Sequence, residues 1–197
     1  MTRKKITFAA ILAVAILFAT SEANAQLKGE VMAGYGFKDG YNIGIGVRAG
    51  KDGVIESQKQ IYIGGVFAYH LGKTQETPGF GGVTSKVTVN LWYAGGDVGY
   101  NIPLEGQSFK LRASTYIGVA NISSKFETSG GSGGDFGLGG GVGGGSSSGS
   151  RTEFMIAPGA TFFFPLGGDL TFGADARIII VSDANAFVVN ATIRKSF

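Results

Sequence analysis

The feature that most constrains this fold is an alternation of apolar residues with small or polar ones, which recurs from residue 30 to the C-terminus. In the segment 41–50, odd positions carry Tyr, Ile, Ile, Val and Ala, whereas even positions carry Asn, Arg and glycines. A period of two is typical of a β-strand with two unlike faces, because successive side chains point to opposite sides of the backbone. The pattern therefore predicts an all-β chain.

The same alternation predicts eight strands. They cover residues 30–37, 41–50, 61–71, 92–102, 110–119, 153–164, 171–180 and 187–196. The segment 86–102 changes phase, and we take 92–102 as its spanning part because a tilted transmembrane strand needs about 9–11 residues. Either the strand continues past the membrane, or a bulge interrupts it near Gly95-Gly96.

The predicted connections differ in length on the two sides of the sheet. Tight turns marked by proline and glycine lie at 101–106 and 164–169, on the side of both termini. Longer loops lie at 73–85 and 126–150 on the opposite side. Short periplasmic turns and long extracellular loops are typical of outer-membrane barrels. The connection 51–59 is longer than this rule prefers, and Asp52-Gly53 is an alternative hairpin there.

We expect the apolar face to point outward, towards lipid. The opposite face is rich in glycine, which suits a crowded eight-stranded interior better than a water-exposed surface. Aromatic residues on the apolar face gather near strand ends, as in interfacial girdles. These aromatic residues are Tyr35, Phe37, Tyr41, Tyr69, Trp92, Tyr100, Phe154, Phe162 and Phe164. The reverse phase would put charged side chains into lipid, at roughly 2–4 kcal/mol for each Arg or Lys at the midplane.

The N-terminus has the pattern of a secretory signal peptide at 1–25. Basic residues at 3–5 precede an apolar run at 6–19, and the segment ends in Ala23-Asn24-Ala25. This order suits cleavage after Ala25, with Ala23 and Ala25 as the small residues of the cleavage site. The apolar run is too short for a transmembrane helix, which takes about 20 residues. We expect one mature domain at 26–197.

Charge and cysteine content exclude several classes of partner. The chain has 17 basic and 14 acidic residues, and removal of the signal leaves 14 against 13. This near-balance gives no support to nucleic-acid binding. The chain has no cysteine, so it has no disulfide, no thiolate metal site and no lipidated cysteine after the signal.

The mature chain resembles the small OmpA/OmpX-like outer-membrane β-barrel family over nearly its whole length. The resemblance rests on the segments 61–65, 69–72 and 97–101 and on the closing strand to Phe197. It implies an eight-stranded antiparallel up-and-down transmembrane β-barrel in a Gram-negative outer membrane, monomeric, among phospholipid and lipopolysaccharide. It also implies that Phe197 and Ile193 belong to the signal read by the barrel-assembly machinery, although Lys195 departs from the usual apolar residue.

Charged residues on the inward face predict an ion-pair network in the lumen. They are Glu30, Arg48, Asp97, Lys110, Arg112, Asp175, Arg177 and Arg194. Because the first and eighth strands are neighbours in a closed barrel, Glu30 can reach Arg48 or Arg194. We interpret the network as a plug, since an eight-stranded interior is narrow enough for side chains to fill. The alternative is that rearranged pairs open a small pore.

No residue pattern predicts an active site, a cofactor or a metal centre. His70, the one histidine, is expected to face the lumen near the outer rim, without the His-x-Ser pattern of a lipid A deacylase. One histidine and no cysteine give a transition metal few ligands. The Gly/Ser tract at 129–150 lacks the Gly-Lys-Ser/Thr ending of a phosphate-binding loop, and its composition instead predicts a mobile extracellular loop. We therefore expect a structural or surface-interaction protein, with a low-conductance porin as the alternative and a lipid A-modifying enzyme as a distant third.

Overall fold

The computed structural model describes residues 27–38, 41–72, 74–79, 83–129, 145–182 and 185–197. The expected signal peptide at 1–25, with Ala23 and Ala25, lies outside the described residues, and so does most of the Gly/Ser tract. In the described part of the chain, no helix is long and apolar enough to cross a membrane.

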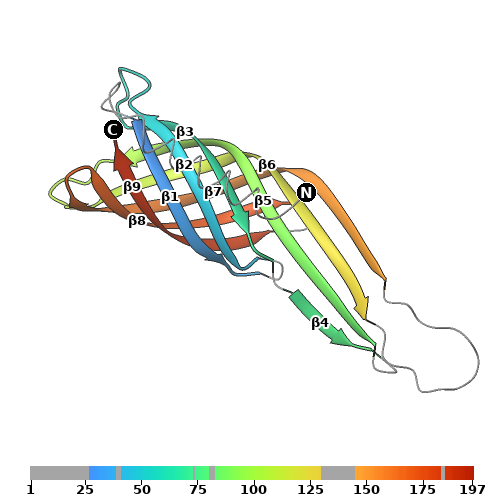
Figure 1. Ribbon diagram of the computed structural model, residues 1–197. Helices are drawn as coiled ribbons and strands as arrows, with labels where there is room; N and C mark the ends of the chain where they lie inside the picture. Colours follow the sequence, from blue (N-terminus) through green and yellow to red (C-terminus); the bar gives the residue numbers. More distant parts are fainter. Residues whose placement is uncertain (1–26, 39–40, 73, 80–82, 130–144, 183–184) are drawn as a thin grey trace, which may run out of the picture.

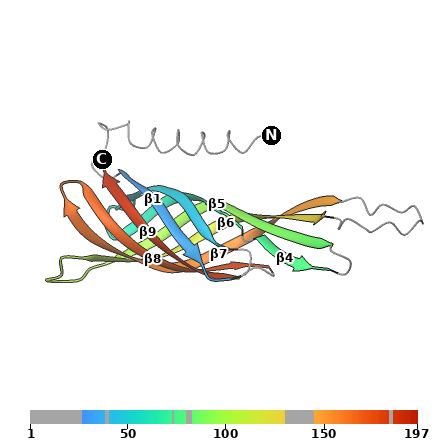
Figure 2. The same cartoon turned by 60° about the horizontal axis from the view of Figure 1, so that its bottom comes forward.

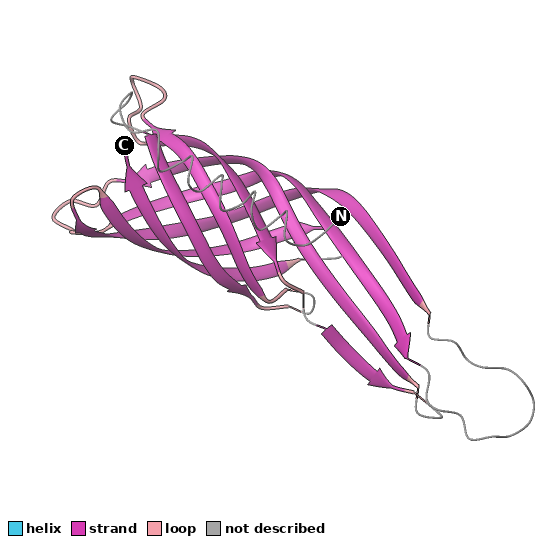
Figure 3. Cartoon of the chain, in the orientation of Figure 1, coloured by secondary structure: helices cyan, strands magenta, loops and turns pink. Residues whose placement is uncertain are grey.

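The described residues form nine β-strands (Figures 1 and 3). In chain order they are β1 (Leu27–Gly36), β2 (Ile43–Asp52), β3 (Ile61–His70), β4 (Thr74–Pro78), β5 (Thr84–Ile102), β6 (Lys110–Ser129), β7 (Ser146–Gly167), β8 (Leu170–Val181) and β9 (Ala186–Ser196).

Eight of these strands close into a barrel. Each pairs with its neighbours in antiparallel register, and the pairings β1–β9 and β3–β5 close the ring (Figure 2). β4 lies outside the ring and pairs with β5 alone. The predicted eight-stranded antiparallel barrel is confirmed, and the ninth strand is an addition to one of its loops.

The two ends of the barrel differ. The described chain ends, Leu27 and Phe197, lie at the end that also carries the connections after β2, β5 and β7; we call this the turn end (Figure 1). At the opposite end, β5, β6 and β7 continue beyond the ring together with β4 (Figure 1). We call this four-stranded sheet the extension.

The wall of the barrel is apolar outside, and the buried polar and charged groups lie inside. On β6, Ile117 is 45% exposed, while its neighbour Tyr116 is completely buried. The buried polar groups include arginines and carboxylates, whereas the exposed side chains of the wall are mostly aliphatic or aromatic. In water such a surface would be an aggregation liability, but in lipid it is the expected surface of a transmembrane barrel. The predicted outward phase is confirmed.

Aromatic rings form two groups on this outer surface. At the turn end, Phe109 packs against Phe162 and Phe164, with ring centroids 6.2 and 6.0 Å apart. At the extension end, the ring of Phe37 lies 5.2 Å from Tyr35 and 5.9 Å from Phe187. Amphipathic or bulky rings at both ends of an apolar wall are typical of the girdles that mark the two membrane interfaces.

Tyr41 was predicted on the outer face, and this is wrong. Its side chain is only 5% exposed, and its ring lies 5.7 Å from that of His70 inside the barrel. Tyr41 precedes the first residue of β2, so the alternation of the strand does not govern its direction. Gly36 makes room for it, because a Cβ at that position would lie 2.6 Å from the Cβ of Tyr41.

β5 runs without interruption from Thr84 to Ile102. Gly95 and Gly96 keep regular pairing with β3 and β6, so the overshooting strand is confirmed and the bulge alternative is wrong. The glycine at 95 has a packing reason, because a Cβ there would lie 2.4 Å from the carbonyl oxygen of Ile117. The backbone of β6 therefore leaves room only for glycine at position 95, and the strand stays regular there.

The loops at the extension end are shorter than predicted. β6 and β7 remain paired as far as Glu127 and Ser146, so the first and last residues of the predicted loop at 126–150 belong to strands. The predicted loop at 73–85 likewise contains β4. These segments are rich in serine and threonine and have no apolar alternation, so their strands could not be predicted from the pattern. Their residues are nevertheless compatible with strand pairing on a solvated surface.

The two predicted connections lie at the turn end with shifted bounds, 103–109 after β5 and 168–169 after β7, and the alternative hairpin at Asp52-Gly53 is wrong. Gly106, Gly167 and Gly168 adopt positive φ angles of 71°, 115° and 57° in the turns after β5 and β7. Asp52 instead pairs with Tyr62 as part of the strand ladder. The connection between β2 and β3 is therefore a loop at 53–60. Its first residue, Gly53, has a φ angle of 65°.

The outward phase predicts a position-dependent cost for a charge on β6. We expect Ile117→Arg, in the middle of the outer wall, to destabilise the barrel by roughly 2–4 kcal/mol. Phe126→Arg, on the extension of the same strand where the native ring is 41% exposed, should change stability by less than about 0.5 kcal/mol. Urea unfolding in lipid vesicles, followed through the single tryptophan, Trp92, measures both. Equal costs at the two sites would contradict the assigned lipid face.

Candidate functional site: the barrel interior

The structure places seven of the eight predicted lumen charges inside the barrel. Their exposed fractions range from 0% to 4%, and they are Glu30, Arg48, Asp97, Arg112, Asp175, Arg177 and Arg194. The prediction for Lys110 is wrong, because its side chain is exposed. Lys110 is the first residue of β6, and at the margin of the wall its side chain reaches water.

Arg48 is the centre of the buried charges. Its Nε and one terminal nitrogen donate hydrogen bonds to the two carboxylate oxygens of Glu30, at 2.6 and 2.7 Å. The other terminal nitrogen donates to the hydroxyl of Tyr116 at 3.0 Å and lies 3.4 Å from Asp97 and 3.7 Å from Asp175. Glu30 stands opposite Arg48 on one side and Arg194 on the other, and it pairs with Arg48 in two-point geometry.

A second arginine, Arg177, binds the carboxylate of Asp175 from two nitrogens, at 2.8 to 3.0 Å. The same carboxylate accepts hydrogen bonds from Thr161 at 2.6 Å and from Asn190 at 3.2 Å. The guanidinium group of Arg177 also lies 3.5 Å from the centroid of the Tyr116 ring. These contacts join four consecutive strands of the ring, β6 to β9, on the inner side of the wall.

Near the turn end, two further arginines stack on aromatic rings. The guanidinium group of Arg112 lies 3.7 Å from the ring centroid of Tyr62 and 5.0 Å from that of Phe163, while Arg194 lies 3.7 Å from Phe163. Arg112 also donates to the side-chain oxygen of Asn101 at 3.1 Å. Stacking on a ring satisfies the flat faces of a guanidinium group but not its N–H donors.

The half of the interior nearer the extension is apolar, which the sequence analysis missed. Its residues are buried Met, Leu, Ile, Val, Ala and Tyr side chains, including Met32, Ala68, Leu91, Tyr93, Met155, Ile179, Val181 and Val188. The runs 178–181 and 186–189 are apolar on both faces, which was the available signal. Because every position of such a run is apolar, the alternation does not show that its inward face is apolar as well.

His70 lies in this apolar half, only 1% exposed. Its ring lies 5.7 Å from Tyr41 and stacks on Tyr93 with 5.9 Å between centroids. Its Nδ1 is 3.5 Å from the carbonyl oxygen of Asn42. These neighbours are those of a packed structural histidine. Among the residues that the structure describes, no group of three His, Asp or Glu side chains is arranged to hold a metal ion.

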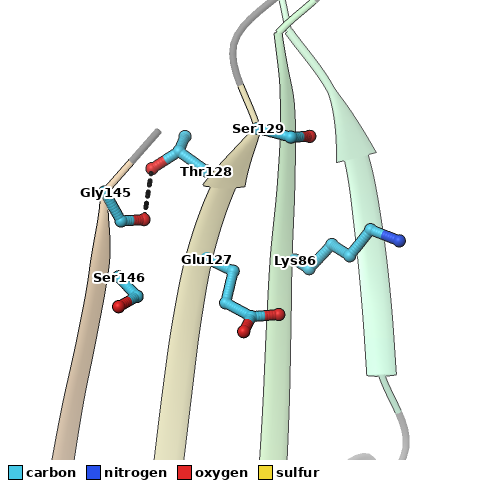
Figure 4. A pocket seen from close by; sticks show the side chains of 6 residues that line it. All are labelled: Lys86, Glu127, Thr128, Ser129, Gly145 and Ser146. Atoms are coloured by element: carbon cyan, nitrogen blue, oxygen red, sulfur yellow. Dashed lines mark hydrogen bonds between the residues drawn. The ribbon is translucent and has the colours of Figure 1, made fainter. Parts of the chain in front are cut away.

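The tip of the extension carries a small polar pocket (Figure 4). It is lined by Lys86, Glu127, Thr128, Ser129, Gly145 and Ser146. Nearby ion pairs are exposed: Lys86 pairs with Glu76 at 2.6 Å, which raises the pKa of Lys86. Lys125 pairs with Glu127 and lowers the pKa of that carboxyl group. Such pairs are weak because water and salt screen them.

The proposed assembly residues lie at the turn end. Ile193 is 50% exposed on the outer face of β9. The backbone N–H of Phe197 donates to the carbonyl oxygen of Leu27 at 2.9 Å, and the ammonium group of Lys195 lies 5.0 Å from the Phe197 ring. The last strand is therefore fixed to the first strand up to the final residue.

An apolar outer wall that encloses buried charges, in a closed ring of eight antiparallel strands, defines the fold class of the small outer-membrane β-barrels. Solved structures of similar fold include the N-terminal β-barrel domain of Pseudomonas aeruginosa OprF, with a TM-score of 0.53 at 12% identity, covering 88% of this chain and 98% of that one. Neisserial surface protein A (NspA) gives a TM-score of 0.53 at 10% identity, covering 88% and 98%. A major outer membrane protein from Thermus thermophilus gives 0.51 at 13% identity, covering 87% and 99%.

No protein-family model and no curated protein sequence matches the chain. At these identities the structural similarity concerns the fold, and at that level the OmpA/OmpX-like resemblance of the sequence is confirmed.

The central ion pair predicts a strong coupling between two substitutions. Arg48→Gln should destabilise the barrel by about 3–5 kcal/mol, because Glu30 is left as a buried charge without its main partner. Adding Glu30→Gln should restore part of this loss, since the second change removes the stranded charge. Lys51→Gln, a partly exposed position on the same strand, is the matched control and should cost less than about 0.5 kcal/mol. Additive effects in the double variant, measured by urea unfolding, would contradict a direct pair.

Proposed function

We propose that this chain is an integral outer-membrane β-barrel protein with a structural or surface-interaction role. The observation that carries the proposal is the reversal of polarity across the wall: apolar rings and aliphatic chains outside, arginines and carboxylates inside. Such a cylinder is stable in lipid, where its closed hydrogen-bond ladder leaves no unpaired edge. The signal-like segment at 1–25 supports export to a membrane beyond the cytoplasm.

The proposed orientation has the turn end in the periplasm and the extension outside the cell. Short turns on the periplasmic side and long loops outside are the general arrangement of these barrels. The connection after β7 is a tight turn at Gly167-Gly168 and that after β5 covers 103–109, whereas β5, β6 and β7 project from the opposite end. In this orientation the polar extension and the Gly/Ser tract would be the parts presented to the environment or to a host surface.

We propose that the lumen is plugged. Arg48, Arg112, Arg177, Tyr93 and Tyr116 are large side chains, each at most 1% exposed, at successive levels of the interior. Ion pairs and ring contacts join Arg48 and Arg177 to strands that are not their neighbours in the ring. Ordered pairs with this burial favour a filled interior over a continuous water column.

The proposed partners are outer-membrane phospholipids and lipopolysaccharide around the wall, and the barrel-assembly machinery during biogenesis. The exposed aromatic groups at both ends support lipid contact at two interfaces. Phe197 and Ile193 are proposed as the assembly signal by resemblance to similar barrels. We propose that the protein is a monomer. We also propose that it has no catalytic activity, since His70 is surrounded by Tyr41 and Tyr93 and is turned away from lipid. An unchanged lipid A mass spectrum after deletion of the gene would agree with this, and a changed acylation pattern would favour an enzyme.

The proposal predicts heat-modifiable migration of a protein in the outer-membrane fraction. A closed barrel resists detergent at room temperature and unfolds on boiling, so the two samples should run at different apparent masses on a gel. The band should be found in the outer-membrane fraction and should shift on heating. A chain that is soluble and monomeric without detergent would contradict the assignment of the outer face.

A plugged lumen and a porin make opposite predictions for conductance. We expect no channel openings from the wild type in planar bilayers, and also none from Arg112→Ala, because the pairs around Arg48 still fill the middle of the lumen. Single-channel recording measures both proteins, with Lys110→Ala at the exposed turn end as the control. Regular openings of the wild type that change in Arg112→Ala would favour the low-conductance porin.

A further inference from the structure

Two arginines share one aromatic ring close to the turn end of the lumen. Arg194 of β9 lies 3.7 Å from the ring centroid of Phe163, and Arg112 of β6 lies 5.0 Å from the same centroid. Both side chains are deeply buried, at 4% and 0% exposure, and Phe163 is 1% exposed. Two guanidinium groups are thus held near each other where water cannot screen them freely.

The charges around this ring do not balance. We call the group Lys28, Asp52, Arg112, Phe163 and Arg194 the turn-end chamber. It contains three cationic side chains, and the single carboxylate, Asp52, is shared between Lys28 and Arg112, the latter at 3.4 Å. Lys28 also interacts electrostatically with both arginines.

Glu30, which lies opposite Arg194 in the register of β1 and β9, interacts electrostatically with both arginines and so offsets part of this excess, but its hydrogen bonds go elsewhere. Both of its oxygens accept hydrogen bonds from Arg48, at 2.6 and 2.7 Å, and one also accepts from Thr192 at 3.1 Å. The chamber therefore keeps an excess of positive charge beside a carboxylate that is already occupied.

Each of the two arginines also has a buried donor without an acceptor. One terminal nitrogen of Arg112 and the Nε of Arg194 make no hydrogen bond within the part of the chain that the structure describes. Buried polar groups in folded proteins are almost always hydrogen-bonded, and charged donors are the costliest to leave unpaired. Positive charge and free donors together are the two requirements of an anion site.

We propose that the turn-end chamber binds a small inorganic anion of the halide type, held between the free donors of Arg112 and Arg194. A monatomic ion suits two donors that come from separate, deeply buried side chains. A phosphate or sulfate ion would bring four oxygen atoms to the same two donors and would leave some of them unpaired. The anion neutralises part of the excess charge and links β6 to β9 through the chamber.

The site predicts that halide stabilises the barrel at constant ionic strength. The probe is chloride, exchanged for gluconate, with the chain 26–197 refolded in detergent micelles. Binding to the folded state alone should raise Tm by about 3–6 °C when chloride is roughly tenfold above its Kd. Arg194→Gln should lose this rise, whereas Lys110→Gln, an exposed charge at the same end, should keep it.

A second measurement keeps the proposal testable if Arg194→Gln does not refold. Crystals of the wild type grown in bromide should show an anomalous scattering peak between the two guanidinium groups beside Phe163. A peak there supports the site. Equal Tm in chloride and gluconate, a halide effect retained in folded Arg194→Gln, or a bromide crystal without that peak would each overturn it.

Discussion

Closure of the hydrogen-bond ladder is the constraint on which the rest of the structure depends. In hydrocarbon an unpaired backbone N–H or carbonyl group costs several kcal/mol, so a sheet can cross a membrane only when its first and last strands meet. Here β1 pairs with β9 from Lys28 to Gly36. The backbone hydrogen bond from Phe197 to Leu27 continues this pairing to the last residue. Closure at eight strands then leaves an interior that side chains must fill.

The interior is filled by two kinds of chemistry. Towards the turn end, charged groups are joined around Arg48 and Arg177, and their bonds specify which strands face one another across the lumen. Towards the extension, apolar side chains and the rings of Tyr93 and His70 pack as in a soluble protein core. Tyr116 lies at the boundary, where its hydroxyl accepts from Arg48 and its ring covers Arg177.

Strand number, phase and most inward charges could be predicted because a period of two links each residue to a face. The prediction was wrong where that rule stops acting. Tyr41 lies outside β2 and does not follow the alternation, whereas Lys110 pairs with the buried Phe163 but lies at the rim of the barrel, where its side chain reaches water. The apolar half of the lumen was not predicted, because Ile179 lies between two outward-facing isoleucines. A run that is apolar at every position does not distinguish the inner face from the outer one. Which carboxylate Arg48 binds depends on side-chain geometry across the ring, which no one-dimensional pattern encodes.

The continued pairing of β5 with β6 beyond the ring has a mechanical consequence. From Asn90 to Thr84 the two strands stay in register with Ser123 to Ser129, and at about 3.3 Å per residue this adds a stem on the order of 20 Å long. The headgroup zone on one side of a bilayer is only about 5–8 Å deep. On a barrel oriented as proposed, the stem would therefore hold its outer end, at Glu127 and Ser146, clear of the lipid surface. A stem of this kind sets the distance from the membrane at which its outer end meets other molecules.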